Sequence, residues 1–221
     1  MYICEKSMSD VSTIRRWIKI GEGTQLDFKS SINSPEKIAR NIVAFANSRG
    51  GVLVVGVEDK GFVSGVEIEG EKYILEKTAK EYCSPAIPLR FRVYPYMDKQ
   101  VLSVHIAESM YKPHKVVSPK NDTAKIYIRL GDKCVEPPSF IRNLFEKNEL
   151  NPTTRTTEYY HSMQKVITFL RQHGQINVAE CIELLYVSER NAERLLVDFS
   201  LEGKIKPRGQ DLVQGFVLCG S

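Results

Sequence analysis

The sequence predicts an α/β (α+β) protein, with a mixed-sheet domain over residues 1–150 and a small, mainly helical domain over residues 158–221. Three observations support this fold class. The run from Val52 to Val57 is almost wholly apolar, which is typical of a strand buried on both faces. Residues 89–94 and 100–106 form two strand-like segments around a short turn, as in a β-hairpin. The polar, proline-containing stretch 151–157 then leads into a segment with the 3.6-residue apolar period of helices.

Helices and further strands surround the predicted central strand. We expect a helix capped by Ser9, and then a strand in which Leu26 and Phe28 face one side and Asp27 faces the other. Ser34 followed by proline begins the next helix, which Gly50 or Gly51 should end because glycine tolerates a left-handed backbone. The remaining expected elements are a short strand over 62–66, a helix over 71–82 and an alternating strand over 125–130.

The last 64 residues predict three helices and a hairpin. The first helix should stop at Gly174, Asn177 should cap the second, and Ser188 should cap the third. Gly203 ends the third helix, and strands at 204–206 and 216–218 complete a β-wing. This order is the plan of a winged helix-turn-helix domain.

The composition argues against a membrane-spanning protein, a disulfide-stabilised protein and a zinc-binding protein. The chain has 221 residues, of which 42% are hydrophobic and 26% charged, as in ordinary globular proteins. Its longest apolar run is far too short to cross a membrane, and its first residues lack the features of a signal peptide, so we expect a cytoplasmic protein. Five scattered cysteines without C-x-x-C spacing indicate neither a disulfide framework nor a zinc site. The net charge of +4 lies in the first 150 residues, because acidic and basic side chains balance thereafter.

Acidic residues occur at the ends of two predicted core strands. Glu22 and Asp27 are five positions apart, so we expect Gly23 to supply the bend that lets both reach one site, and Asp59 follows the central strand. Three converging carboxylates could hold Mg²⁺ or Mn²⁺ and activate water for phosphodiester cleavage, with Lys29 neutralising a phosphate. The alternative interpretation is structural, with Glu22 paired to Lys29 and Asp59 serving as a turn residue.

The motifs in this region resemble those of the Schlafen AlbA-type domain family. The resemblance lies in G-E-G-T-Q-L-D-F-K at 21–29, A-F-A-N-S-R-G-G at 44–51, G-V-E-D-K-G at 56–61 with G-V at 65–66, and Y-I-R-L-G at 127–131. It covers roughly residues 8–145. Bacterial members commonly carry a C-terminal winged helix and are described as DNA-binding or transcriptional regulators, and some have been labelled ATP-binding.

Animal relatives in this family include RNA-cleaving proteins with a three-carboxylate site. The resemblance places that site here at Glu22, Asp27 and Asp59, with Glu58 as another candidate for the third group. ATP binding has little support in the residues, because no G-x-x-x-x-G-K-[ST] loop is present.

Candidate nucleic-acid contacts fall in both domains. On the third C-terminal helix, Arg190 suits guanine and Asn191 suits adenine, with Arg194 on the same exposed side. On the wing we expect phosphate contacts from basic side chains, namely Lys204, Lys206 and Arg208. In the first domain one strand face would carry Lys125, Tyr127 and Arg129, and a preceding loop would carry Lys112, His114 and Lys115. Arg40 and Arg49 are interpreted as surface charges.

These patterns favour a bacterial nucleic-acid-binding protein of the transcriptional-regulator type, acting on DNA as a homodimer. The alternative from another class is a Mg²⁺- or Mn²⁺-dependent endoribonuclease that uses the three carboxylates. A third possibility is an interaction module whose winged helix binds another protein.

Overall fold

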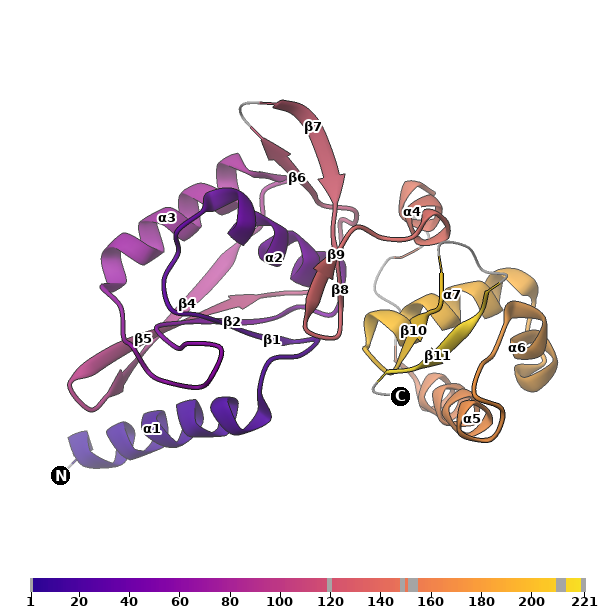
Figure 1. Ribbon diagram of the computed structural model, residues 1–221, viewed down its shortest axis with the longest axis horizontal. Coiled ribbons are helices and arrows are strands. Elements are labelled where there is room, and N and C mark those ends of the chain that lie inside the picture. Colours follow the sequence, from indigo (N-terminus) through magenta and orange to yellow (C-terminus); the bar gives the residue numbers. More distant parts are fainter. Residues whose placement is uncertain (1, 119–120, 148–149, 151–154, 210–213, 220–221) are drawn as a thin grey trace.

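A four-stranded mixed sheet forms the centre of the N-terminal part of the computed structural model (Figure 1). The structure describes residues 2–118, 121–147, 150, 155–209 and 214–219. The strands follow the order β1-β2-β5-β4, in which β1 and β2 are parallel and the other pairs are antiparallel. The sheet and its helices are α1 (Tyr2–Ile20), β1 (Leu26–Lys29), α2 (Pro35–Asn47), β2 (Gly51–Val55), α3 (Ile68–Glu81), β4 (Leu89–Tyr96) and β5 (Lys99–Ile106).

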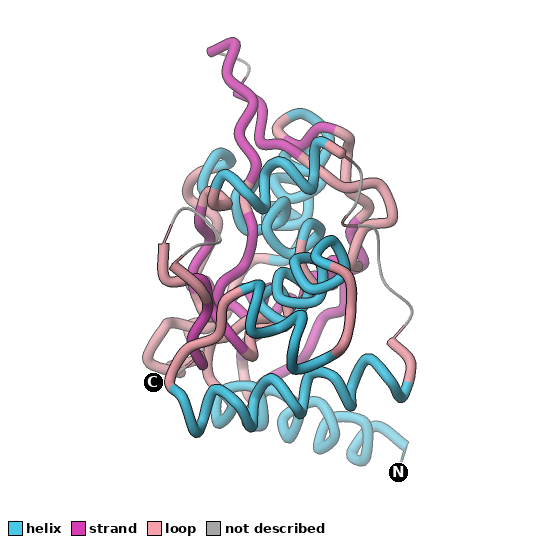
Figure 2. The backbone as a smooth tube through the Cα atoms, turned by 90° about the vertical axis from the view of Figure 1, so that its right-hand side faces the viewer, coloured by secondary structure: helices cyan, strands magenta, loops and turns pink. Residues whose placement is uncertain are grey.

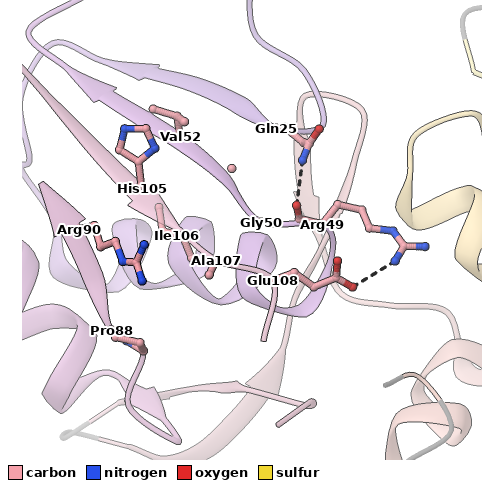
Figure 3. A pocket seen from close by; sticks show the side chains of 11 residues that line it. Gln25, Arg49, Gly50, Val52, Pro88, Arg90, His105, Ile106, Ala107 and Glu108 are labelled. Carbon is pink, nitrogen blue, oxygen red and sulfur yellow. Dashed lines mark hydrogen bonds and ion pairs between the residues drawn. The ribbon is translucent and has the colours of Figure 1, made fainter. Parts of the chain in front are cut away.

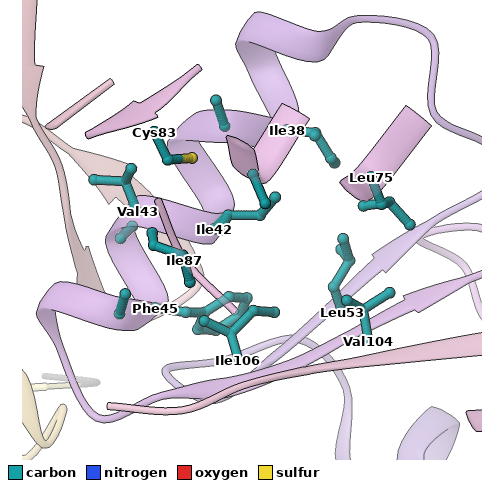
Figure 4. Packing of buried hydrophobic residues seen from close by; sticks show 14 of the residues in the cluster. Ile38, Ile42, Val43, Phe45, Leu53, Leu75, Cys83, Ile87, Val104 and Ile106 are labelled. Atoms are coloured by element: carbon teal, nitrogen blue, oxygen red, sulfur yellow. The ribbon is translucent and has the colours of Figure 1, made fainter. Parts of the chain in front are cut away.

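Helices cover both faces of this sheet. Helices α2 and α3 pack on one face around a cluster of aliphatic side chains that includes Ile42, Leu53 and Val104 (Figure 4). Helix α1 lies along the other face, where Trp17 meets Tyr94 edge-on at 5.2 Å between ring centroids. Because β2 is covered from both sides, its last three residues are fully buried, as its apolar run predicts.

Most element boundaries agree with the sequence. The side chain of Ser34 caps α2 by accepting a hydrogen bond from the Lys37 amide, and Pro35 occupies the first turn. The predicted hairpin of β4 and β5 is confirmed. Helix α1 and the region 62–66 differ from expectation. Helix α1 begins at Tyr2 rather than after Ser9, and the region 62–66 forms an isolated bridge between Val57 and Val63 instead of a strand.

Small strands extend from this body. A three-stranded sheet has the order β3-β6-β7, and β6 and β7 project away from the remaining structure (Figures 1 and 2). The expected continuous strand over 125–130 is instead divided at Tyr127, because β7 pairs with β6 whereas β8 pairs with β9. These elements are β3 (Cys83–Ser84), β6 (Lys115–Ser118), β7 (Asn121–Ile126), β8 (Ile128–Leu130), β9 (Lys133–Val135) and α4 (Ser139–Glu146).

The C-terminal part contains three helices and a two-stranded antiparallel ribbon, in the predicted order. Asn177 and Glu180 form a capping box, Ser188 caps the next helix, and Gly174 ends the first helix with φ of 80°. Ile176 bridges to Phe216, which attaches the ribbon to the helices. The elements are α5 (Thr157–His173), α6 (Val178–Leu185), α7 (Glu189–Leu201), β10 (Ile205–Pro207) and β11 (Phe216–Leu218).

The two parts share a buried cluster. Phe140 of α4 meets Phe216 of β11 with ring centroids 5.9 Å apart, and Ile126 and Ile128 join the same cluster. The expected linker falls largely on residues 151–154, which lie outside the described residues. The limits 1–150 and 158–221 therefore stay a prediction. Helix α4 precedes residue 150 in the sequence but packs against the C-terminal helices. None of the described helices combines the length and apolar character needed to cross a membrane.

Candidate functional site

A tight turn brings Glu22 and Asp27 together. The Gly23 amide donates to the Leu26 carbonyl at 2.9 Å, which folds the chain back as the sequence predicts. Glu22 Oε1 then accepts a hydrogen bond from the Phe28 amide at 2.8 Å. Both carboxylates meet Lys29, whose Nζ lies 2.7 Å from Asp27 Oδ2 and 4.0 Å from Glu22 Oε1.

Asp27 is buried beneath α2, with only 3% of its surface exposed. Its Oδ2 accepts a hydrogen bond from Asn41 Nδ2 at 2.8 Å in addition to the Lys29 contact. Its Oδ1 lies 2.9 Å from Nη2 of Arg129. Two cations and an amide therefore already neutralise and hydrogen-bond this carboxylate.

Glu22 has a different environment. Burial raises the pKa of Glu22, the hydrogen bond from Phe28 opposes the rise, and the negative charges of Asp27 and Asp59 add to it. Asp59 is exposed in the loop after β2. The three carboxylates thus influence one another electrostatically, but only Glu22 and Asp59 retain access to solvent.

The fit of a divalent metal can be judged from these contacts. Mg²⁺ and Mn²⁺ need several oxygen ligands that are free to approach the ion. Both oxygens of Asp27 are engaged, and within the described part of the chain no three His, Cys, Asp or Glu side chains form a group suited to a metal ion. In this arrangement Glu22, Asp27 and Asp59 do not fit a metal site.

Arg129 lies in the core, which corrects the expectation that it shares an exposed strand face with Lys125 and Tyr127. It is 1% exposed, donates to the carbonyls of Gly23 and Leu26 at 3.0 and 3.2 Å, and lies over the Phe45 ring. Tyr127 is also buried, whereas Lys125 is exposed and pairs with Glu136. The division of the strand at Tyr127 explains this, because the alternation of faces does not continue across it.

The loop before β6 also differs from expectation. Lys112 and His114 are buried, and only Lys115 is exposed. Nζ of Lys112 lies 2.8 Å from Glu108, and both ring nitrogens of His114 make hydrogen bonds. These two side chains stabilise the fold and do not form an outer basic surface.

Arg49 was interpreted as a surface charge and is instead 7% exposed at the junction of the two parts. Its guanidinium pairs with Glu108 at 3.1 Å, with Asp198 of α7 at 3.3 Å and with Glu202 at 3.6 Å. Arg155 joins the same group through Glu108 at 2.7 Å and Glu202 at 3.0 Å. We call these residues, with Lys112, the junction network: Arg49, Lys112, Arg155, Glu108, Asp198 and Glu202.

The basic residues expected on the C-terminal part are mostly accessible. Arg190 and Asn191 are exposed in the first turn of α7, and Arg194 is half-buried. On and beside β10, Lys204, Lys206 and Arg208 are exposed, and Arg208 also bonds to Gln175. The second half of α7, from Leu196 to Leu201, is fully buried. We call the exposed set the C-terminal basic surface: Arg190, Asn191, Lys204, Lys206 and Arg208.

Two solved structures match this chain at low sequence identity. The DIP2311 protein from Corynebacterium diphtheriae is 15% identical, with a TM-score of 0.46, over 99% of this chain and 39% of that protein. This chain thus spans about two fifths of that protein's length. The other is the N-terminal domain of a Nitrosomonas europaea protein described as related to the ATP-dependent DNA helicase RecG. It is 18% identical, with a TM-score of 0.43, over 56% of this chain and 90% of that domain.

No protein with a curated description matches the sequence. The family model described as Schlafen, AlbA_2 matches residues 22–138, which is more than half of the 221 residues. The matched region begins at Glu22 and contains the Gly23 turn, the buried Asp27–Arg129 pair and the sheet that holds them. This chain belongs to the Schlafen AlbA_2 family.

Proposed function

We propose that this protein binds nucleic acid and acts as a DNA-binding transcriptional regulator, with the segment from α5 to β11 as a winged helix-turn-helix unit. The observation that carries the proposal is that α7 begins with an exposed turn and ends with a buried half. Its first turn presents Arg190 and Asn191 to solvent, whereas Leu196–Leu201 are buried against the rest of the molecule. A helix anchored in this way can present its N-terminal side chains to base edges in a major groove.

The ribbon supports the same interpretation. Lys206 lies on β10, and Lys204 and Arg208 flank that strand, so three cations are exposed beside the helical unit. Cations of this kind contact phosphates and set the position of a protein on DNA. Membership of the Schlafen AlbA_2 family agrees with a nucleic-acid ligand. As a regulator of this type the protein would be cytoplasmic and would bind as a homodimer, so that two half-sites are read.

The proposal can be tested by fluorescence anisotropy with labelled duplex DNA at several salt concentrations. Phosphate binding should weaken steeply as salt rises. Arg190→Ala should cost about 1–3 kcal/mol and relax base preference, while Lys206→Ala should weaken all sequences alike and reduce the salt slope by about 1. Lys165→Ala is the matched control, since Lys165 is exposed on α5 and is not one of the residues of the C-terminal basic surface. Binding that is absent or insensitive to salt would refute the proposal.

The metal-dependent endoribonuclease remains the alternative with a stated test, although no observation favours it. Asp27 is engaged by Lys29, Asn41 and Arg129, which leaves Glu22 and Asp59 as the accessible carboxylates. Cleavage of structured RNA that requires Mn²⁺ and disappears in Glu22→Gln would support it. A protein partner in place of DNA predicts no salt-sensitive affinity for nucleic acid.

A further inference from the structure

A cavity of about 580 Å³ opens at the end of the sheet where β1 and β2 begin (Figure 3). Lys29 and Asp59 lie at or beyond the opposite ends of these strands and do not line the cavity, which instead borders the junction network at Arg49 and Glu108. The polar residues that line it are Gln25, Arg49, Arg90, His105 and Glu108. Its volume falls in the range of small-molecule sites, about 300–1,000 Å³.

One side of the cavity carries positive charge without a compensating acid. Arg90 and His105 are direct partners across β4 and β5, so both side chains project from the same face of the sheet. Arg90 is exposed, and within the described residues no ion pair engages it. His105 contacts Ser103 at 3.2 Å through Nε2. Burial lowers the pKa of His105, and the nearby cations Arg92 and Arg90 lower it further.

Arg49 also lines the cavity, and its guanidinium is directed toward Glu108 (Figure 3). Its terminal nitrogens are paired with Glu108 and Asp198. Glu108 does not supply free negative charge here, because Oε1 contacts Arg49 and Lys112 and Oε2 contacts Arg155.

We infer that this cavity binds a small molecule that bears a phosphate group. Arg90 would contact the phosphate oxygens with the forked geometry that guanidinium groups favour, and His105 would donate a second hydrogen bond. The apolar lining, including Val52, Pro88 and Ile106, would contact the rest of the ligand. This site shares no residue with the C-terminal basic surface, so the phosphate-binding inference and the DNA-binding proposal can be tested independently.

Inorganic phosphate is the first probe, with the His105 ring signal followed by NMR in the full chain. A bound anion should raise the pKa of His105, because it stabilises the imidazolium form. Arg90→Gln should weaken phosphate affinity about tenfold, the effect expected on losing one charged hydrogen bond. Arg171→Gln is the matched control, since Arg171 is exposed on α5 outside the cavity, and it should bind like the unaltered protein.

Further probes distinguish the source of the phosphate. Glycerol phosphate should bind and glycerol should not, which supports a small phosphorylated ligand. If a 5′-phosphorylated single-stranded oligonucleotide shifts His105 while glycerol phosphate does not, the small-molecule inference is overturned in favour of a nucleic-acid end. A His105 signal that does not change on addition of phosphate would also overturn the inference. Equal phosphate affinities in Arg90→Gln and Arg171→Gln would do the same.

Discussion

Arg129 and Asp27 form a buried ion pair, in which Nη2 lies 2.9 Å from Oδ1 and the two side chains are 1% and 5% exposed. The pair joins two residues that are 102 positions apart, Asp27 of strand β1 and Arg129 of the short strand β8. It therefore connects the first and the last of the four motifs that this chain shares with the Schlafen AlbA-type family. The two motifs thus stabilise the fold through this ion pair.

Replacing Asp27 should destabilise the protein more than replacing Glu22. Asp27→Asn leaves Arg129 without its buried counter-charge, and breaking such a pair costs about 3–5 kcal/mol. The pKa of Glu22 is raised in the folded state, so its ionisation opposes folding above its ordinary pKa of 4.5. Glu22→Gln should therefore lose no stability at pH 7. Urea unfolding of both variants measures the contrast.

The contrast matters for any nuclease assay. Lost activity in Asp27→Asn would not separate catalysis from unfolding, whereas Glu22→Gln leaves the core intact. Equal unfolding midpoints for the two variants would contradict the structural role assigned to Asp27.

Acid should weaken the junction network through Glu108. Burial opposes its ionisation, but Lys112, Arg49 and Arg155 outweigh burial and lower the pKa of Glu108 below 4.5. A depressed folded pKa adds stability above the unfolded value, and this is lost as pH falls through the folded value. Glu108→Gln should cost about 3 kcal/mol at pH 7, and its difference from the unaltered protein should shrink as the pH falls below 4.5. A difference that is constant with pH would contradict this assignment.

Gly203 should be less tolerant of alanine than Gly174, although both have positive φ. A Cβ at Gly203 would clash with Thr24 Oγ1, across the junction of the two parts, whereas Gly174 has nothing within 4 Å. Gly174→Ala should cost about 1 kcal/mol from backbone strain alone. Gly203→Ala should cost more, and Thr24→Gly in the same chain should restore the excess. Thermal unfolding of the three variants tests the closeness of the contact.

Tyr186 should be a position where glycine stabilises the protein. It has φ of 56° at the end of α6 and its surface is 92% exposed, so the ring has little packing to lose. Tyr186→Gly should raise the free energy of unfolding by up to about 1 kcal/mol, since a left-handed non-glycine residue is strained. Met97, with φ of 55° and 77% exposed, is a matched position in the β4–β5 turn.

The two glycine variants also report on DNA binding. If Tyr186→Gly is stabilised yet binds DNA more weakly, the ring contributes to the contact. Met97→Gly should be stabilised with unchanged binding, and destabilisation of both variants would refute the strain argument.

Local sequence signals predicted most of the fold. Ser34, Asn177 and Ser188 cap helices because their side chains bond to nearby amides, and such signals are readable from a few residues. The apolar run of β2 likewise predicts that this strand is buried. The start of α1 was missed because a helix can continue through residues without a clear apolar stripe.

The sites were harder to predict because burial of a charge depends on distant partners. Arg49 and Arg129 look like surface residues until the acids of other segments are placed beside them. The carboxylates at Glu22 and Asp27 do converge as the bend at Gly23 suggested, but the sequence did not reveal that Asn41 and Arg129 already engage Asp27. Arg190 and Asn191 follow a recognisable helix cap, and their exposure could be predicted.

The junction network also limits how this protein could be assembled from interchangeable pieces. Arg49 and Lys112 come from the N-terminal part, and Asp198 and Glu202 come from α7 and its end. A C-terminal part grafted from a protein without those two acids would leave Glu108 as the one acid of the network to neutralise Arg49 and Lys112. For recombination, and for the design of chimeras, the natural unit is thus the pair of parts together, whatever ligand each of them binds.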